Sequence, residues 1–509
     1  MDYLIGLDIG TGGIKALLID TTGKVIASHT TELSLSVPRP LWAEQNPEDW
    51  WNGTVASLSA VMRKSGIPPE AVKGIGFSGQ MHSLVLLDKS YKVLRPSILW
   101  CDNRTTPQRN RIEKIVGWER LKELVANPPL EGFTLPKILW VKDEEPEIYK
   151  KIHKICLPKD YIRFRLTGEL TMEISDAAGT VMFDVRNRRW SKEMLSLVEV
   201  PADFLPPVTE SIDVSGHITP AVAHETGLKA GTPVVGGGAD NPCGAVGNGI
   251  VREGRISASI GTSGVIFAHT DSVKIDPAMR VHTFCHTIPH RWYLMGVVLT
   301  AGGAFRWFRD TLGQEEISTA AKSHGEPYDL LVKQANNIPI GSEGLFFLPY
   351  LSGERTPHQD GQARGAWIGI TLGHSRAHLI RAVMEGITFA LRDSIEIMRE
   401  LGINVQQVRA TGGGGKSPFW RQMLADTFDT EVITVNSGEG PAFGAAILAG
   451  VGTKIFNSVE EASDSLIRPT EVTTPIGGNV TQYEDHYRIF RNLYPALRSS
   501  FKSIAQIKS

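Results

Sequence analysis

The sequence predicts an α/β protein built from two copies of one domain. A chain of 509 residues is long enough for two or three domains. Residues 4–20 and 256–267 share one pattern, in which an apolar run leads into a glycine-rich turn and a second apolar run leads out. This pattern is typical of a β-hairpin. Because the hairpins lie half a chain apart, we expect one domain at residues 1–248 and another at 249–509, with the last helix as a candidate to pack back on the first domain.

The predicted elements of the first copy follow from turn and cap signals. Residues 25–33 extend the first hairpin into an antiparallel meander. Asn46 and Pro47 are a typical helix start, with Asn as N-cap and Pro at the first helical position. Residues 72–80 predict a strand that ends in a loop, and residues 83–87 predict the returning strand. A mostly helical stretch over about 105–230 precedes a buried strand at 232–241.

The second copy is expected to repeat this order. Residues 292–298 mirror the third strand of the opening meander. Apolar residues at steps of three to four predict a long helix over 378–401. A short strand at 408–411 runs into four glycines, and Ser417 and Pro418 then begin a helix. A strand at 432–435, a helix at 441–451 and a helical tail after about residue 480 complete the chain.

Composition and charge exclude several classes of protein. The formal net charge of −2 implies no general attraction to nucleic acid or to an anionic membrane. The four cysteines are scattered, which favours neither a zinc site nor a disulfide framework. No apolar run is long enough to cross a bilayer, and no signal peptide is recognisable. We therefore expect a cytoplasmic protein whose partners include neither nucleic acid nor membrane.

The two hairpin turns are candidate anion sites. They are Gly10-Thr11-Gly12 and Gly261-Thr262-Ser263. Each turn can offer backbone N–H groups and a threonine hydroxyl to one anion, because glycine lets the backbone come close. One such turn is weak support, but two suggest a phosphate chain held between the copies.

Two acidic residues are candidates for chemistry at these turns. Asp8 precedes the first turn by two residues, where a carboxylate can hold a divalent cation beside a phosphate. Its alternative role is to stabilise the turn. Asp240 follows a glycine run at a strand end, where ligands gather in α/β folds, and it could take a proton from an attacking hydroxyl. Its alternative role is a helix cap, since Asn241-Pro242 resembles a helix start.

Two other motifs have competing interpretations. Gly412 to Ser417 is not the nucleotide-binding loop G-x-x-x-x-G-K-[ST], because Ala410 stands where that loop requires glycine. The strand, glycines and helix still suit a ligand at a helix N-terminus. His82 follows Met81 in a loop, where a lone histidine is usually structural, although polar groups at strand exits also bind sugar hydroxyls. We expect a structural role for His282 and His286.

Two long segments, 132–144 and 365–385, carry a family resemblance. The chain resembles the FGGY carbohydrate kinases, of the actin/hexokinase/Hsp70-like (ribonuclease H-like) ATPase architecture, with a cleft between two duplicated domains. Other segments are similar to the ketopentose kinases of that family: 41–45, 79–82, 95–100, 157–161, 175–180 and 348–358. The resemblance implies phosphorylation of D-xylulose by ATP with Mg²⁺, a small-molecule ketose as partner, and a homodimer as a common state.

The resemblance also implies roles for individual residues. Asp240 corresponds to the catalytic base, and Asp8 to the acid near Mg²⁺, directly or through water. The residues implied to bind ATP are Gly10, Thr11, Gly12, Lys15, Gly261, Thr262, Ser263, Gly412, Gly413 and Gly414. The residues implied to bind the sugar are Gln80, Met81, His82, Trp100, Asp102 and Asn241.

Alternatives remain at this point. The same chemistry could act on D-ribulose, L-ribulose or glycerol. A non-catalytic actin-like nucleotide-binding protein would share the fold, but two retained acids argue against it. A nicotinamide-dependent enzyme is disfavoured because no G-x-G-x-x-G follows a strand.

Overall fold

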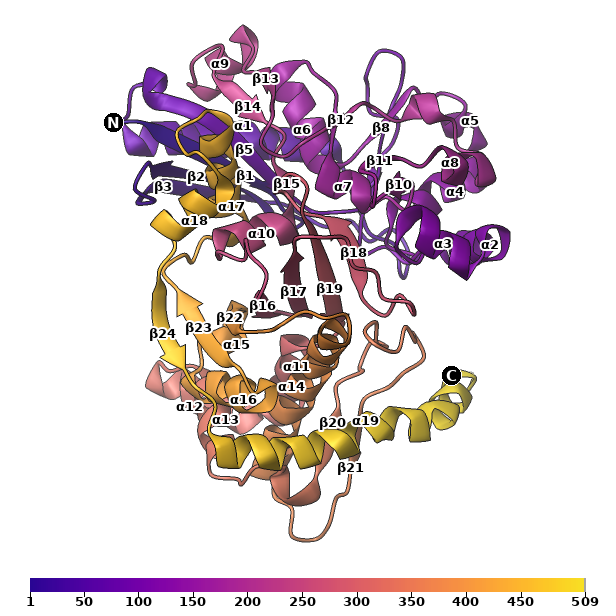
Figure 1. Cartoon of the computed structure of the whole chain (residues 1–509), viewed down its shortest axis with the longest axis vertical. Coiled ribbons are helices and arrows are strands. Elements are labelled where there is room, and N and C mark those ends of the chain that lie inside the picture. Colours follow the sequence, from indigo (N-terminus) through magenta and orange to yellow (C-terminus); the bar gives the residue numbers. More distant parts are fainter. Residues whose placement is uncertain (508–509) are drawn as a thin grey trace.

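Two α/β domains stacked along the long axis make up the molecule (Figure 1). The computed structural model describes residues 1–507. Each domain is built on a seven-stranded sheet, with the orders β13-β14-β5-β1-β2-β3, where β15 also pairs with β5, and β18-β19-β17-β16-β22-β23-β24. The first sheet comprises β1 (Tyr3–Ile9), β2 (Gly13–Asp20), β3 (Val25–Glu32), β5 (Val72–Gly79), β13 (Val214–His217), β14 (Pro233–Val235) and β15 (Gly238–Ala239). The second comprises β16 (Arg255–Ile260), β17 (Gly264–Thr270), β18 (His282–Cys285), β19 (Trp292–Val298), β22 (Gln407–Thr411), β23 (Glu431–Val435) and β24 (Pro469–Thr473).

The two sheets repeat one topology, which confirms the predicted duplication. In the first, β2 pairs antiparallel with β1 and β3, and β5 lies parallel to β1. In the second, β17 pairs antiparallel with β16 and β19, and β22 lies parallel to β16. The carboxyl ends of parallel neighbours meet at one edge of each sheet, which is where ligands of α/β folds gather.

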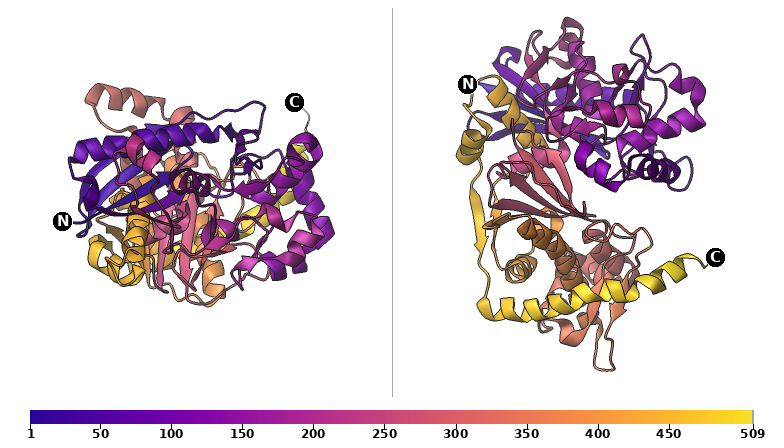
Figure 2. Two further views of the ribbon diagram at one scale, coloured as in Figure 1. Left: turned by 90° about the horizontal axis from the view of Figure 1, so that it is seen from above. Right: turned by 45° about the vertical axis from the view of Figure 1, so that its right-hand side comes forward.

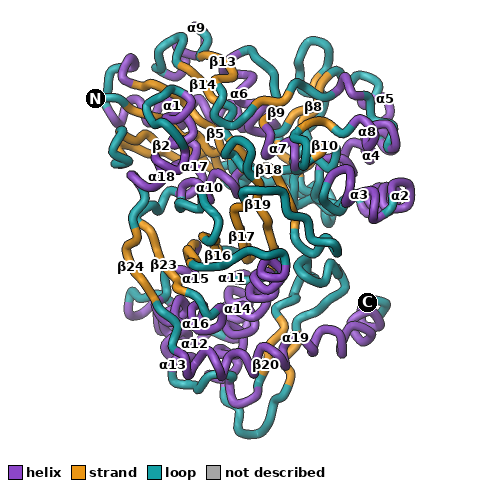
Figure 3. The backbone as a smooth tube through the Cα atoms, viewed as in Figure 1, coloured by secondary structure: helices purple, strands orange, loops and turns teal. Residues whose placement is uncertain are grey.

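Helices cover both sheets, as the tube view shows by colour (Figure 3). The first half contains α1 (Pro47–Ser65), α2 (Thr106–Val116), α3 (Trp118–Val125), α4 (Thr134–Glu144), α5 (Pro146–Tyr149), α6 (Pro158–Thr167), α7 (Ile174–Ala178), α8 (Lys192–Leu197), α9 (Pro220–Thr226) and α10 (Asp240–Gly247). The second contains α11 (Gly302–Leu312), α12 (Gln314–Ser323), α13 (Pro327–Asn336), α14 (Arg376–Glu400), α15 (Gly412–Gly415), α16 (Pro418–Phe428), α17 (Gly440–Gly452), α18 (Val459–Leu466) and α19 (Gly477–Ala505). Short strands form two-residue or three-residue pairs: β4 (Glu44–Gln45) with β7 (Ser97–Ile98), β6 (Val85–Leu87) with β8 (Lys154–Cys156), β9 (Met172–Glu173) with β12 (Val208–Thr209), β10 (Phe183–Asp184) with β11 (Arg189–Trp190), and β20 (Phe346–Leu348) with β21 (Ala366–Ile368).

Helix α17 ties the second half of the chain to the first sheet. It packs on β1 and β5 as well as on α10. The approach is so close that a Cβ at Gly6 would lie 1.8 Å from the Ala442 carbonyl oxygen, and one at Gly76 would lie 1.9 Å from that of Ala445. Glycine is therefore required at both positions. The result is that α10 and α17 cross between the domains beside the predicted site.

Two local expectations are refined by the structure. The strand expected at 83–87 is shorter, and β6 pairs antiparallel with β8 rather than returning along β5. The chain turns away at His82, whose φ is 66°.

The last helix, α19, packs on α16 and α14 and runs across the second domain (Figure 2). Within residues 1–507, no helix is long and apolar enough to span a membrane.

Candidate active site

Both glycine turns have backbone N–H groups without a protein acceptor among residues 1–507. In each turn the first glycine N–H is used internally: Gly10 donates to the Gly13 carbonyl at 3.1 Å, and Gly261 donates to that of Ser263 at 3.0 Å. The next two amides of each turn have no protein acceptor among residues 1–507: those of Thr11, Gly12, Thr262 and Ser263. Unpaired amides grouped in this way are suited to anionic oxygens.

Asp8 lies on β1, and Asp240 directly follows β15; these two strands pair with β5 from opposite sides. In the sheet register, Asp8 pairs with Ser78, and Ser78 pairs with Gly238, two residues before Asp240. Oδ1 of Asp8 is buried and lacks a hydrogen-bond partner within the described chain. Burial raises the pKa of Asp8, while the Ser78 hydroxyl and the Lys15 ammonium oppose that rise.

Asp240 is the first residue of α10 and has a strongly raised pKa. Burial, and then repulsion from Asp8, raise the pKa of Asp240 to about 7. Its Oδ1 accepts hydrogen bonds from the backbone and side-chain nitrogens of Asn241, at 2.7 and 2.9 Å. A carboxylate with a pKa near neutrality is suited to general-base chemistry. Asn241 therefore orients the acid in this structure.

Hydrogen bonds beside the first turn join the side chains of Thr11, Gln80 and Trp100. The Trp100 indole N–H donates to the Thr11 hydroxyl at 2.9 Å, and that hydroxyl donates to Oε1 of Gln80 at 3.2 Å. The Ser83 hydroxyl donates to the same Gln80 oxygen at 3.0 Å. The hydroxyl of Thr11 is thus committed to neighbours in the first domain, which leaves only its amide for an anion at the turn.

His82 is a neutral side chain held in one orientation. Its Nδ1 lies 2.7 Å from the Gly179 carbonyl oxygen, and its ring stacks on Phe133 with centroids 4.1 Å apart. Burial and the nearby Lys137 ammonium lower the pKa of His82 to about 3. Since a carbonyl only accepts, Nδ1 carries the proton and Nε2 is an acceptor. Met81 is buried beside it, with Sδ 3.9 Å from the Tyr293 hydroxyl oxygen.

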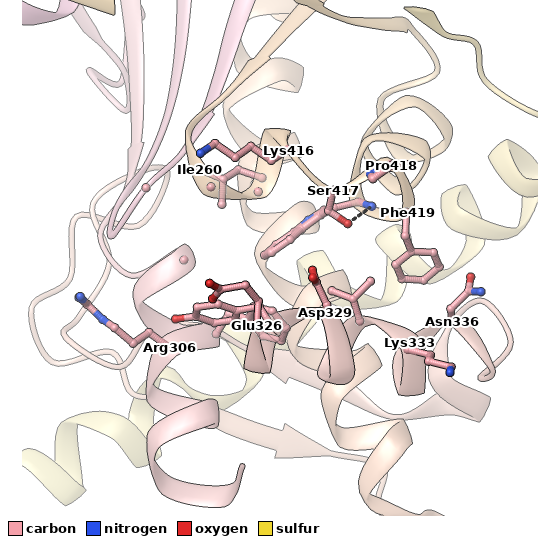
Figure 4. Close-up of a pocket in the computed structure, with 18 of the residues that line it drawn as sticks. Ile260, Arg306, Glu326, Asp329, Lys333, Asn336, Lys416, Ser417, Pro418 and Phe419 are labelled. Atoms are coloured by element: carbon pink, nitrogen blue, oxygen red, sulfur yellow. Dashed lines mark hydrogen bonds between the residues drawn. The ribbon is translucent and has the colours of Figure 1, made fainter. Parts of the chain in front are cut away.

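A cavity of about 1060 Å³ lies beside the second turn. The turn and the glycine loop form one wall, through Gly261, Thr262, Gly413 and Gly414. Figure 4 shows Asp329, Lys333 and Asn336 on one side of the cavity and Ser417, Pro418 and Phe419 on another. Phe305, Tyr328 and Trp420 add aromatic surface. An apolar cavity with a few polar groups is the usual form of a small-molecule site.

The glycine loop needs its glycines for close packing on the second hairpin. Gly412 has a φ of 75°, and a Cβ there would lie 2.5 Å from the Ile260 carbonyl oxygen. A Cβ at Gly414 would lie 2.8 Å from the Ile260 side chain. Residues 412–415 form the short helix α15, and α16 follows. A second cavity, of about 780 Å³, extends from this loop to Asp240 and Asn241.

Two predicted site residues are engaged elsewhere. The Asp102 carboxylate is fully buried and binds the Arg104 guanidinium, with contacts of 2.7–3.0 Å, and the Ala43 amide at 2.6 Å. These contacts occupy both oxygens of the Asp102 carboxylate in the structure. Lys15, which pairs with Asp8 across β1 and β2, forms an ion pair with Glu439 at the start of α17.

Sequence reasoning missed the residues that support His82. The Lys137 ammonium is fully buried and donates to the His82 and Gly132 carbonyls at 3.0 and 2.7 Å. The Thr134 hydroxyl donates to the same His82 oxygen at 3.1 Å. A lysine inside the apolar run 135–141 was the available signal. His282 is buried and its Nδ1 lies 3.2 Å from Oδ1 of Asn127.

Comparison with known proteins identifies the class. Residues 3–247 and 256–453 match the N-terminal and C-terminal domains of the FGGY family of carbohydrate kinases. The chain is 44% identical to a xylulose kinase of Bacillus subtilis, over 97% of both chains, and 32% identical to a gluconokinase of the same organism, over 99% of this chain and 98% of the other. It superposes on a crystal structure of a xylulose kinase from Rhodospirillum rubrum with a TM-score of 0.91 and 30% identity, covering 98% and 100% of the two chains.

The duplicated domains with a glycine turn in each place the molecule among the actin-like ATPase folds. The chain belongs to the FGGY family of carbohydrate kinases.

Proposed function

We propose that this enzyme transfers the γ-phosphoryl group of ATP to the primary hydroxyl of D-xylulose, giving D-xylulose 5-phosphate and ADP. The chemistry is supported by one observation above all: Asp240, with a pKa raised to about 7, lies beside Asp8 at one edge of the first sheet, and a cavity connects it with the glycine loop of the second domain. The choice of sugar rests on the full-length similarity to proteins named xylulose kinase.

Asp240 acts as the general base in this proposal. Its carboxylate accepts the proton of the attacking hydroxyl, and Asn241 fixes the acceptor oxygen by two hydrogen bonds. Phosphoryl transfer depends mainly on positioning and on neutralising charge. A general base of suitable pKa contributes roughly 10²–10⁴-fold to the rate.

Mg²⁺ fits the residues present. Asp8 offers a buried oxygen without a protein partner, and Mg²⁺ commonly takes one or two carboxylates together with phosphate oxygens and water. When bound, the ion neutralises charge on the phosphates. The free amides of the two turns bind the phosphate oxygens from opposite domains.

The nucleoside occupies the 1060 Å³ cavity. Its aromatic walls accept a flat base, and Gly412 to Gly414 let the backbone approach the ribose and the first phosphate. On the other side of the phosphates, Nε2 of His82 accepts a hydrogen bond from a sugar hydroxyl. Gln80, Met81 and Trp100 complete that side.

Measurement of ADP release tests the proposal. The enzyme with Mg-ATP is assayed with D-xylulose, D-ribulose, L-ribulose, glycerol and D-gluconate. D-gluconate is included because of the related gluconokinase. The proposal predicts the highest kcat/KM with D-xylulose. Preference for another sugar would mean that the pocket around His82 binds that sugar in place of D-xylulose. ADP release that is absent or independent of sugar contradicts the kinase chemistry.

A further inference from the structure

A cluster of ionisable side chains is fully buried next to β5, the strand that lies between Asp8 and Asp240 in the sheet. We call it the buried ionic cluster: Lys159, Asp160, Arg163, Glu173 and Asp176, each with 0% exposure. Its members come from α6, β9 and α7. None of them lines either of the two cavities described above.

Lys159 is the centre of this cluster. Its Nζ lies 3.1 Å from Oδ1 of Asp160, 3.2 Å from Oε2 of Glu173 and 3.0 Å from Oδ2 of Asp176. The Arg163 guanidinium lies 3.1 Å from the same Asp160 oxygen. Removing five ionisable groups from water is costly, and such clusters stabilise a fold less than apolar packing would. Net stability is therefore a weak explanation for this cluster.

One hydrogen-bonded chain leads from the cluster to the residue before Asp240. The Ser175 hydroxyl donates to Oε2 of Glu173 at 2.7 Å and accepts from the Ala239 amide at 2.9 Å. Ala239 is the N-cap of α10, whose first residue is Asp240. The chain Lys159–Glu173–Ser175–Ala239 thus fixes the backbone from which the Asp240 side chain projects.

The cluster also supports the strand between the two acids. Gly79 pairs with Ile9 on one side and with Ala239 on the other. A Cβ at Gly79 would lie 2.9 Å from Cβ of Lys159, so this strand end rests directly on the lysine. Lys159 therefore lies against the end of β5 and is also linked, through Glu173, to Ser175.

We propose that Ser175, oriented by Glu173 and Lys159, is a positioning residue for Asp240. The inference rests on the proposed role of Asp240 as general base. Without the Ser175 hydroxyl, the Ala239 amide loses its acceptor, and the start of α10 shifts relative to β5. Misplacement of a reacting group by about 1 Å can cost about 100-fold in rate.

Two serine variants separate positioning from stability. Ser211 is a matched control, because its buried hydroxyl donates to Oε1 of the same Glu173 at 2.6 Å, whereas the Ala239 amide donates to Ser175. We expect Ser175→Ala to lower kcat by about 10–100-fold with the KM values for ATP and D-xylulose within about twofold. Ser211→Ala is expected to keep kcat within about threefold, although both variants lower Tm. Equal effects on kcat in the two variants overturn the proposal.

Hydrogen exchange of the Ala239 amide provides a second test that needs neither activity nor a variant. The amide is expected to exchange slowly in the native enzyme, because it donates a hydrogen bond to the Ser175 hydroxyl. Rapid exchange overturns the proposal, even where Ser175→Ala does not fold. If no sugar stimulates ADP release, the proposed function fails, while the exchange result still decides the Ser175 contact.

Discussion

Replacement of Asp240 by Asn tests the assigned base through rate and stability together. The substitution keeps the shape of the side chain and removes the proton acceptor. Loss of a general base costs roughly 10²–10⁴-fold in kcat, which corresponds to about 2.7–5.5 kcal/mol of transition-state free energy. Because Asn241 and the turns are unchanged, the KM for sugar is expected to change by less than about threefold.

The same substitution is expected to stabilise the protein in a pH-dependent way. Native Asp240 holds its proton up to about pH 7, whereas in the unfolded chain this carboxyl loses its proton near the ordinary value of 3.8. The unfolded state therefore binds fewer protons between these values, so wild-type stability falls as pH rises through that interval. The difference of about three pH units sets an upper limit of about 4 kcal/mol. Because the side chain is only partly buried beside an open cavity, screening reduces this to ~1–2 kcal/mol.

The assays are steady-state ADP release at pH 7.5 and thermal unfolding at pH 5 and pH 8. The variant is expected to lose kcat and to gain Tm relative to wild type, with the larger gain at pH 8. The reasoning is refuted by a kcat within about threefold of wild type, or by a change in Tm that is the same at both pH values.

Three further substitutions test neighbouring parts of the site. Burial is the larger cause of the raised pKa of Asp240, and the Asp8 charge is the second. Asp8→Asn removes that second cause, so the acidic limb of kcat/KM is expected to move to lower pH while kcat falls, and an unmoved limb contradicts the coupling. Gly412→Ala brings a Cβ within 2.5 Å of a β16 carbonyl oxygen and is expected to raise the KM for ATP by about tenfold. The control Gly477→Ala, with open space around it and outside both cavities, is expected to leave that KM unchanged, and similar KM values in the two variants exclude the loop from nucleotide binding. Gly179→Ala places a Cβ 2.9 Å from the His82 ring and is expected to raise the KM for D-xylulose without changing the KM for ATP. A raised KM for ATP with an unchanged KM for D-xylulose would place His82 away from the sugar.

Sequence patterns identified the elements that local chemistry determines. The strand expected at 292–298 matches β19 in its bounds, and the helix after Asn46 begins where the cap predicts. Both follow from turn, cap and periodicity signals that depend on neighbouring residues alone. The duplication was also visible, because both glycine turns retain the same pattern.

Contacts between distant segments were not predictable in the same way. Asp102 has the residue type of a sugar ligand, but its role depends on Arg104 and on the Ala43 amide, 59 positions away. Lys137 shows only as a charge in an apolar run until the His82 carbonyl is placed beside it. The link from Lys159 to Ala239 requires three segments to meet, which no local pattern specifies.

Identification of the product tests the central claim most directly. Wild-type enzyme, Mg-ATP and D-xylulose are incubated together, and ³¹P and ¹³C NMR follow the phosphate. The account predicts one ADP for each D-xylulose consumed, with the phosphate on the oxygen of C5. Phosphate on another carbon would contradict the placement of the primary hydroxyl at Asp240, and free phosphate with unchanged sugar would contradict phosphoryl transfer to a sugar.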